Sequence, residues 1–390
     1  MSNPDPAPGS SASWTRRLAA LLVVAPLASL LLLEVVARVA PIEAFAPDVL
    51  DPGRKIEEAS NRPHPYLSYS LRPSWSNRAG ASRQVSHNAL GFRGPETTWA
   101  KPEGRFRILC LGGSSTYGHT PSSDAATWPA RLEAHLETAR PELDVEVINC
   151  GDSGWSTFES LSNLAFRGIE LKPDLILVYH SINDMRAALY QNPAHPEAQP
   201  QPDNTHWRNT WREERPSPLE ATLEKSRAYQ VLRRYLTDFA AGRDNLYRYV
   251  VVDYDPMAAE LFAAEEPSPQ GFANFQRNLV SIIALARAHG ARVALATQGN
   301  DWSDFGGNTQ LSIDAQQSGM ARMTQVLREV GNERHVLVVE AQAALEEESA
   351  RRREAGESEI FTHEVHLTDE GADLLAQVWA RELLRTGLVP

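Results

Sequence analysis

Short apolar runs alternate with stretches of helical periodicity along the C-terminal part of the chain. Mostly apolar runs that predict buried strands lie at 106–111, 145–149, 175–179, 292–297 and 336–339. Apolar residues at helical spacing lie at 130–136, 159–169, 272–289, 314–330 and 369–384. Five strands separated by helices predict an α/β fold, in which a five-stranded parallel sheet is covered by helices on both faces.

A different pattern occupies the N-terminus. The segment 18–40 is almost entirely apolar, and about 23 residues of helix are enough to cross a hydrocarbon core of roughly 30 Å. Arg16 and Arg17 precede it directly, so we expect a cytoplasmic tail at 1–17 and a single-pass inner-membrane anchor at 18–40. The remainder would then lie on the periplasmic or extracellular side. The alternative is a signal peptide cleaved after Ala44-Phe45-Ala46.

Two further segments are set apart by composition. Residues 41–103 are rich in Pro, Ser, Asn and Arg, and we expect a lead-in of loops and short strands before a domain at 104–390. Within that domain, 186–250 separates the third and fourth strands, with six prolines at 186–218. A connection of this length is typically a functional insertion, and we expect a lid that carries Trp207 and Trp211.

Charge and cysteine content exclude several classes of protein. The 390 residues contain 38 Lys and Arg against 50 Asp and Glu, a formal net charge of −12, so no basic stripe is available for nucleic acid. Arg351-Arg352-Arg353 lies among glutamates, a pattern typical of a solvated helix face. Cys110 and Cys150, the two cysteines, are predicted to be buried free thiols, and no metal or cofactor motif is present.

Polar residues follow the predicted strands where ligands bind in such sheets, beyond their carboxyl ends. The segments are Gly112–Gly118, Asn149–Gly154, Ser181–Asp184 and, before the last helix, His363–Gly371. They supply a hydroxyl, backbone amides, a carboxamide and an imidazole. These groups are what acyl transfer requires: a nucleophile, oxyanion donors and a base.

Four such blocks in this order resemble the SGNH (GDSL-type) hydrolases, which are named for a Ser, a Gly, an Asn and a His. The resemblance covers about 104–390. It implies a flavodoxin-like three-layer α/β/α fold, a serine nucleophile and ester substrates. The segment 88–94 is similar to one that recurs in membrane-anchored relatives, where it would pack the lead-in onto the core with turns at Gly91 and Gly94.

The resemblance assigns roles by position. Ser114 matches the nucleophile, with Ser115 as its competitor, and His366 matches the base. The oxyanion donors would be the backbone N–H groups of Ser114 and Gly154 and the side chain of Asn183.

Two departures from the family pattern concern the turns. Gly113 stands where the Asp of the family's first block is expected, a common variation. Ser181 replaces the Gly of the third block, which raises the question of whether the turn before Asn183 keeps its shape.

A third departure concerns the base. Family members usually place an Asp three residues before the histidine, and His363 occupies that position here. Glu364 or Glu340 could orient His366 instead, or a backbone carbonyl could do so in a Ser–His dyad. Asp369 follows a capping Thr and is expected to serve the first turn of the last helix.

These features predict an exported serine esterase that works through an acyl-serine intermediate on a small-molecule or glycan ester. An O-acyltransferase that acts on envelope polysaccharide uses the same chemistry with a sugar hydroxyl in place of water. A non-catalytic binding protein of the same fold is a third hypothesis, motivated by the missing Asp.

Overall fold

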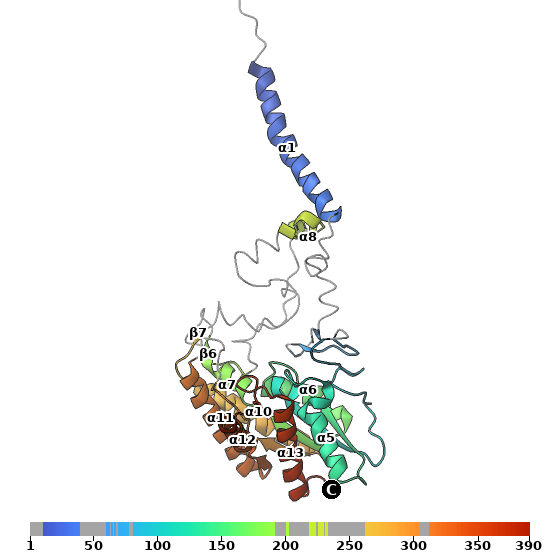
Figure 1. Ribbon diagram of the computed structural model, residues 1–390, viewed down its shortest axis with the longest axis vertical. Helices are drawn as coiled ribbons and strands as arrows, with labels where there is room; N and C mark the ends of the chain where they lie inside the picture. The colour runs from blue at the N-terminus through green and yellow to red at the C-terminus, as the bar shows by residue number, and fades with distance from the viewer. Residues whose placement is uncertain are drawn as a thin grey trace, which may run out of the picture. The chain divides into compact units, whose positions relative to one another are not determined.

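The computed structural model describes residues 11–39, 60–62, 64, 66, 67, 69–77, 81–191, 200–202, 218–223, 225–229, 231, 232, 262–303 and 312–390. Contacts divide the chain into two units (Figure 1). One comprises Met1–Ala59 with Glu213–Tyr249, and the other comprises Ser60–Arg212 with Val250–Pro390. The lead-in from residue 60 onward therefore clusters with the α/β domain.

The first unit contains helix α1, Ser11–Val39, and helix α8, Pro218–Leu223. Glu34 and Arg38 form an i, i+4 ion pair at 2.6 Å. Ser226 Oγ also donates to the Glu34 carboxylate, at 2.7 Å. Among the described residues, no helix qualifies by length and apolar character as a membrane span, so the predicted anchor over 18–40 is not supported. The cellular location remains a prediction from sequence.

The second unit is built on one parallel sheet. Its strands are β3 (Phe106–Gly112), β4 (Val145–Asn149), β5 (Leu175–Tyr179), β8 (Arg292–Ala296) and β9 (Leu337–Val339). They lie in the order β4-β3-β5-β8-β9, which is 2-1-3-4-5 along the chain, the flavodoxin-like order with its switch point between β3 and β5. All five strands match the apolar runs of the sequence.

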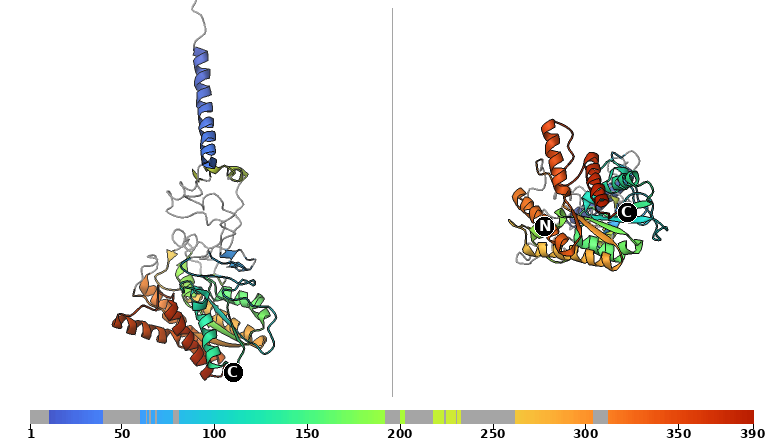
Figure 2. Two further views of the ribbon diagram at one scale, coloured as in Figure 1. Left: turned by 45° about the vertical axis from the view of Figure 1, so that its right-hand side comes forward. Right: turned by 90° about the horizontal axis from the view of Figure 1, so that it is seen from below.

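Helices cover both faces of this sheet (Figure 2). One face packs against α5 (Trp128–Ala139), α12 (Ala341–Ala355) and α13 (Asp369–Arg385), and α5 and α13 lie side by side (Figure 1). The other packs against α6 (Thr157–Phe166), α7 (Ile182–Leu189), α10 (Pro269–Ala288) and α11 (Ile313–Arg334). Alternate strand residues enter the two cores, Ile108 one and Leu109 the other, as the pleat requires. The predicted three-layer α/β/α fold is thus confirmed.

Both cysteines are free and buried, as predicted. The backbone N–H of Cys150 donates to the Cys110 carbonyl at 3.0 Å. Burial raises the pKa of both thiols, and they therefore act as small core residues.

The predicted insertion begins later than residue 186. Residues 186–189 belong to α7, and strand β6 (Tyr190–Gln191) pairs with β7 (Phe262–Ala263). Ala187 and Leu189 are buried in the core, so residues 186–189 belong to the domain core and not to the insertion. Trp207 and Trp211 lie outside the described residues. In the lead-in, β1 (Asn61–Arg62) pairs with β2 (Ser70–Leu71).

Candidate active site

The four polar segments predicted from the sequence follow β3, β4 and β5 and precede α13. The turn after β3 forms the single-turn helix α4, Ser114–Tyr117. Parallel strands end at one edge of a sheet, which explains how segments far apart in the chain reach one place. We call residues 360–368, before α13, the histidine loop.

Ser114 and His366 are brought together. Ser114 Oγ and His366 Nε2 are 2.8 Å apart, the distance of a hydrogen bond between a nucleophile and its general base. Because α4 begins at Ser114, the backbone N–H of Ser114 has no acceptor within the helix. Ser115 has a different environment: it is 6% exposed and its hydroxyl donates to the Val365 carbonyl at 2.9 Å. Ser114 is therefore the hydroxyl that contacts the imidazole.

The two other predicted donors are Gly154, which lies in a turn, and Asn183, which lies in the first turn of α7. Gly154 has a φ of 78°, a conformation that glycine adopts without strain. Asn183 Nδ2 donates to the Trp155 carbonyl at 2.8 Å, which fixes the amide and leaves its second N–H for another acceptor. A Cβ on Gly113 would lie 2.6 Å from that Nδ2 and 2.8 Å from the Trp155 carbonyl oxygen, so a side chain there would disturb the same hydrogen bond.

Ser181 does not alter the turn before Asn183. Its φ is −174°, an extended value open to any residue. Glycine is therefore not required, and Ser181 serves as the N-cap position of α7.

Neither predicted acid lies on the imidazole. His366 Nδ1 is buried and has no hydrogen-bond partner. Glu364 pairs with Arg186 instead; burial alone would raise the pKa of Glu364, but Arg186 outweighs it and the pKa is lowered. Glu340 forms an ion pair with Arg328 at 2.7 Å, with both side chains about half exposed. His366 Nδ1 therefore bonds to none of the three orienting groups that the sequence left open, which were Glu364, Glu340 and a backbone carbonyl. Ser114 and His366 form a pair without an orienting acceptor.

Two further residues near the base, His363 and Asp369, have other surroundings. His363 is exposed, with its ring centroid 6.0 Å from that of His366. Asp369 lies in the first turn of α13, as predicted, and accepts a hydrogen bond from the Ser122 N–H at 2.7 Å.

Burial controls the protonation of the base. Burial is the largest cause that lowers the pKa of His366 from 6.5 to about 4, and the neighbouring His119, whose ring centroid is 5.4 Å away, contributes to the same shift. The imidazole is therefore neutral at pH 7, the form that accepts a proton.

The pH dependence of activity should report this shift. We expect the acid limb of kcat/KM for a p-nitrophenyl ester to lie well below 6.5, toward about 4, because His366 stays neutral until then. Between pH 6.5 and about 4, His366 is protonated in the unfolded chain but neutral in the folded one. The free energy of unfolding should therefore fall as the pH falls through this range. Rates and circular dichroism measured together from pH 4 to 8 separate the two effects. An acid limb at pH 6.5 or above would contradict the lowered pKa of His366.

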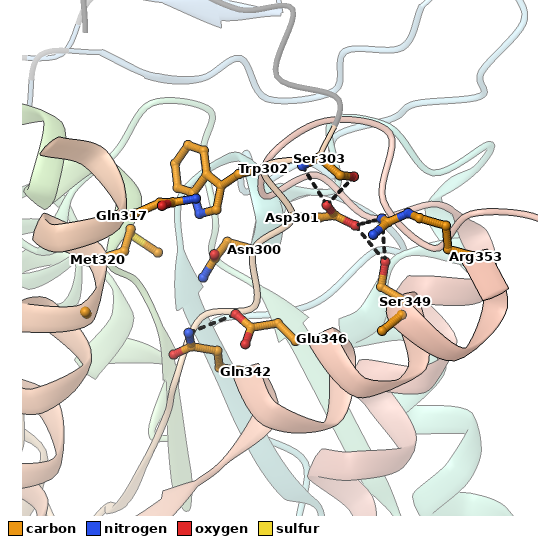
Figure 3. Close-up of a pocket in the computed structure, with 12 residues that line it drawn as sticks. Asn300, Asp301, Trp302, Ser303, Gln317, Met320, Gln342, Glu346, Ser349 and Arg353 are labelled. Carbon is orange, nitrogen blue, oxygen red and sulfur yellow. Dashed lines mark hydrogen bonds and ion pairs between the residues drawn. The ribbon is translucent and has the colours of Figure 1, made fainter. Parts of the chain in front are cut away.

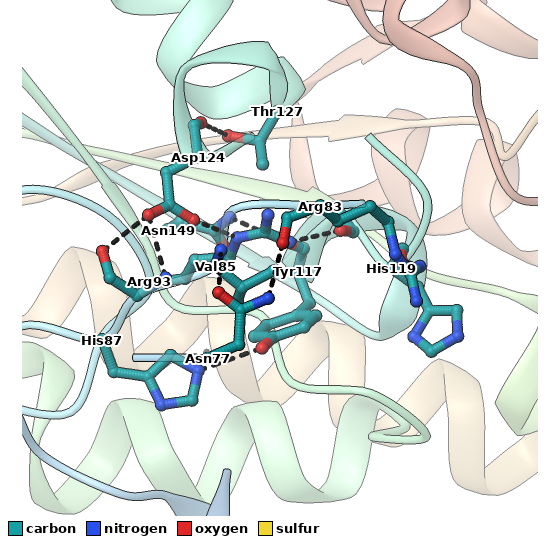
Figure 4. A network of polar contacts seen from close by, with 12 residues as sticks. Asn77, Arg83, Val85, His87, Arg93, Tyr117, His119, Asp124, Thr127 and Asn149 are labelled. Atoms are coloured by element: carbon teal, nitrogen blue, oxygen red, sulfur yellow. Dashed lines mark hydrogen bonds and ion pairs between the residues drawn. The ribbon is translucent and has the colours of Figure 1, made fainter. Parts of the chain in front are cut away.

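The lead-in contributes a buried cation to the nucleophile helix (Figure 4). Arg93 is 3% exposed. Its Nη1 donates to the carbonyl of Tyr117 at 2.9 Å and to that of Gly118. Its Nε donates to Asp124 at 2.8 Å. The last carbonyls of a helix lack donors within the helix. Arg93, which precedes β3 in the chain, supplies a donor to two of these carbonyls.

Two further contacts complete this end of the helix. Asn149, at the end of β4, donates to the carbonyls of Thr116 and Tyr117 at 2.9 and 3.2 Å. Gly118 has a φ of 86°, and a Cβ there would lie 3.1 Å from Arg93 Nη1. Gly91 and Gly94 also have positive φ, as the predicted turns require. The role of Arg93 itself was not predicted, since nothing in a local motif shows which helix an arginine will reach.

Loss of this cation should destabilise the domain. Arg93→Met removes the buried ion pair with Asp124 and the donor to the Gly118 carbonyl, whereas Ser86 still donates to Asp124 and Asn149 to the Tyr117 carbonyl. We expect about 2–4 kcal/mol of lost unfolding free energy. Arg105→Met is the matched control, because its ion pair with Asp144 at 3.1 Å is largely exposed and should contribute less than about 1 kcal/mol. Urea denaturation measures both. Equal losses would show that Arg93 does no more than a surface arginine.

A cavity of about 580 Å³ lies beside the segment 300–303, which contacts the histidine loop through Asp301 (Figure 3). Residues 300–303, α11 and α12 line it, and the Asp301 N–H donates to the Glu364 carbonyl at 2.8 Å. Burial would raise the pKa of Asp301, but hydrogen bonds from Ser303, Ser349 and Arg353 lower it to about 2. The carboxylate of Asp301 is thus held by the protein.

Within the described ranges no three His, Cys, Asp or Glu residues group as metal ligands, and the predicted absence of a metal stays a prediction.

The fold and the serine–histidine geometry are those of a hydrolase. A sequence profile of the GDSL-like lipase/acylhydrolase family matches residues 110–374, more than half of the chain. The chain therefore belongs to this family, and it is an ester hydrolase. No curated protein matches it.

Solved structures are similar over most of their length. An acetylxylan esterase from Geobacillus stearothermophilus has 16% identity and a TM-score of 0.41, covering 71% of this chain and 94% of that one. An alpha/beta hydrolase from the metagenome of Lake Arreo, Spain, has 14% identity and a TM-score of 0.40, covering 75% and 100%. With TM-scores below 0.5, neither likeness bears on the substrate.

Proposed function

We propose that this chain hydrolyses carboxylic esters through an acyl-serine intermediate on Ser114. The observation that carries the proposal is the 2.8 Å contact between Ser114 Oγ and His366 Nε2. A serine hydroxyl is a weak nucleophile until an adjacent base takes its proton, and His366 is neutral and within reach.

In the first half-reaction, Ser114 Oγ attacks the ester carbonyl carbon while its proton passes to His366 Nε2. The carbonyl π electrons move onto oxygen, which becomes an oxyanion. When the tetrahedral intermediate collapses, the bond to the alcohol oxygen breaks and the imidazolium returns the proton to the leaving alcohol. The acyl group is then bound to Ser114.

Three donors would stabilise the oxyanion: the N–H of Ser114 at the start of α4, the N–H of Gly154, and the Asn183 amide. Asn183 is in the first turn of α7, and its amide is held by the Trp155 carbonyl. A donor fixed in this way needs little reorganisation as charge develops. Loss of a single donor of this kind typically lowers kcat by about 10²–10³-fold.

The second half-reaction repeats these steps with water. His366 Nε2 takes a proton from water, whose oxygen attacks the acyl carbon, and collapse releases the carboxylic acid and restores Ser114. The imidazolium forms transiently in both halves, and here no carboxylate stabilises it through Nδ1. We therefore expect slower turnover than a full triad would support.

An O-acyltransferase would differ only in its acceptor, a sugar hydroxyl in place of water. The aromatic residues of the insertion that would favour transfer, Trp207 and Trp211, lie outside the described residues, and no contact of the site supports a sugar acceptor over water. A purely binding role is disfavoured by the nucleophile–base contact, which binding alone does not need.

Ester hydrolysis by the full-length protein tests the proposal. Ser114→Ala and His366→Ala should each lower kcat for p-nitrophenyl acetate by at least about 10³-fold, because each removes one member of the pair. Ser281→Ala, on the outer side of α10, is the control and should leave kcat unchanged.

The same assay separates the alternatives. Acetyl transfer to an added sugar in preference to water would favour the transferase. Full activity of Ser114→Ala, or a folded wild-type protein that never acylates, would overturn the proposed mechanism.

A further inference from the structure

One hydrogen-bonded chain joins residues that adjoin three members of the site. Gln298, two residues beyond β8, is 2% exposed. Its Oε1 accepts from the Ile182 N–H at 2.8 Å, and its Nε2 donates to Ser115 Oγ at 3.1 Å. Ser115 Oγ in turn donates to the Val365 carbonyl at 2.9 Å. We call this set of bonds the Gln298 tie.

The positions of its members are what make the tie informative. Ile182 precedes Asn183, Ser115 follows Ser114 and Val365 precedes His366. The tie thus links the oxyanion amide, the nucleophile and the base through their immediate neighbours, although these lie on three separate segments of the chain.

The donors and acceptors along the tie permit only one arrangement. The single hydroxyl proton of Ser115 goes to the Val365 carbonyl, so Ser115 Oγ must accept from Gln298. Rotating the Gln298 amide by 180° would place Nε2 against the Ile182 N–H, donor against donor. Each of the polar atoms along this buried chain has a partner in it, and such a network holds its members in place.

The histidine loop needs such support because the imidazole has no acid. His366 Nδ1 is buried without a partner, so the ring cannot be oriented through that atom. The loop is held by its carbonyls instead: that of Leu367 accepts from Thr120 Oγ1 at 2.6 Å, and that of His366 accepts from the Thr362 N–H at 2.8 Å. Within this set, the bond to Val365 is the one that leads back to the nucleophile.

We propose that Ser115 and Gln298 are positioning residues, which keep nucleophile, base and oxyanion amide in register as a triad carboxylate otherwise would through the imidazole. This inference rests on the proposed function. Small displacements of a nucleophile and base are costly, since about 1 Å of misplacement can cost about 10²-fold in rate.

The test compares kcat and KM of the full-length protein for p-nitrophenyl acetate. Ser115→Ala and Gln298→Met should each lower kcat about 10–10²-fold with KM within about twofold, because both side chains are buried and bond to other residues of the chain. Gln316→Met is the matched control. Gln316 on α11 is fully buried, and neither of its amide atoms has a hydrogen-bond partner, so its replacement should leave kcat unchanged.

A second variant distinguishes positioning from general loss of structure. His363→Asp introduces a carboxylate beside the base, at a position whose ring centroid is now 6.0 Å from that of His366. We expect this carboxylate to accept from His366 Nδ1 and to orient the ring without the tie. We expect His363→Asp to raise kcat by a larger factor in the Ser115→Ala background than in the wild-type chain. Ser115→Ala removes one oxygen from a helical residue, so this comparison remains available if Gln298→Met fails to fold.

Equal gains in both backgrounds, or an unchanged kcat in Ser115→Ala, would overturn the inference. A kcat lowered in Ser115→Ala and Gln316→Met alike would also overturn it, since the loss would then not be specific to the tie. If the wild-type protein has no esterase activity, the proposed function fails and the inference with it. An active wild type with an unaffected Ser115→Ala contradicts the inference alone.

Discussion

The hydrogen bond between Ser114 Oγ and His366 Nε2 joins residues 252 positions apart in the chain. A bond of about 2.8 Å between such distant residues survives only if both ends are fixed by the rest of the fold. The parallel sheet brings the two segments to one edge. Closer control comes from Arg93 and Asn149 at the far end of the serine helix and from the carbonyl contacts of the histidine loop. The sheet and these contacts together fix the distance between Ser114 Oγ and His366 Nε2.

Burial has opposing effects on the base. It keeps His366 neutral far into the acid range, which favours proton acceptance. It also disfavours the imidazolium that must form during each half-reaction, and the buried Nδ1 finds no carboxylate to offset this. In the usual triad an acid both orients the ring and stabilises its charge. Here orientation is left to the backbone. The nearby carboxylate of Glu364 favours the imidazolium, but its ion-pair partner Arg186 and the neighbouring His119 oppose it.

Much of the architecture was predictable because it depends on local patterns. Apolar runs marked all five strands, and polar residues directly after them marked the site, since parallel strands end together. The nucleophile, base and two further donors were named by family resemblance. The family pattern favoured Ser114 over Ser115, and because both follow the same strand, the direction of each hydroxyl is what distinguishes them in the structure.

The contacts that organise the site were not predictable, because they join segments with no sequence relationship. Arg93 could have paired with any acid, and Gln298 carries no motif. Glu364 and Glu340 were reasonable orienting acids by their positions in the sequence. In the structure Glu364 pairs with Arg186 and Glu340 with Arg328, so neither carboxylate bonds to the imidazole. The predicted start of the insertion, residue 186, falls inside α7 (Ile182–Leu189). The short polar start of this helix gives no helical periodicity in the sequence, so its last residues were assigned to the insertion.

The central claim is that Ser114, and not its neighbour, forms the covalent intermediate. The most direct measurement is rapid acid quenching during turnover of a p-nitrophenyl ester, followed by mass spectrometry of the peptide that contains both serines. The account predicts an acyl adduct on Ser114 that is absent from Ser114→Ala. An adduct on Ser115, or steady hydrolysis with no adduct on this peptide, would contradict it.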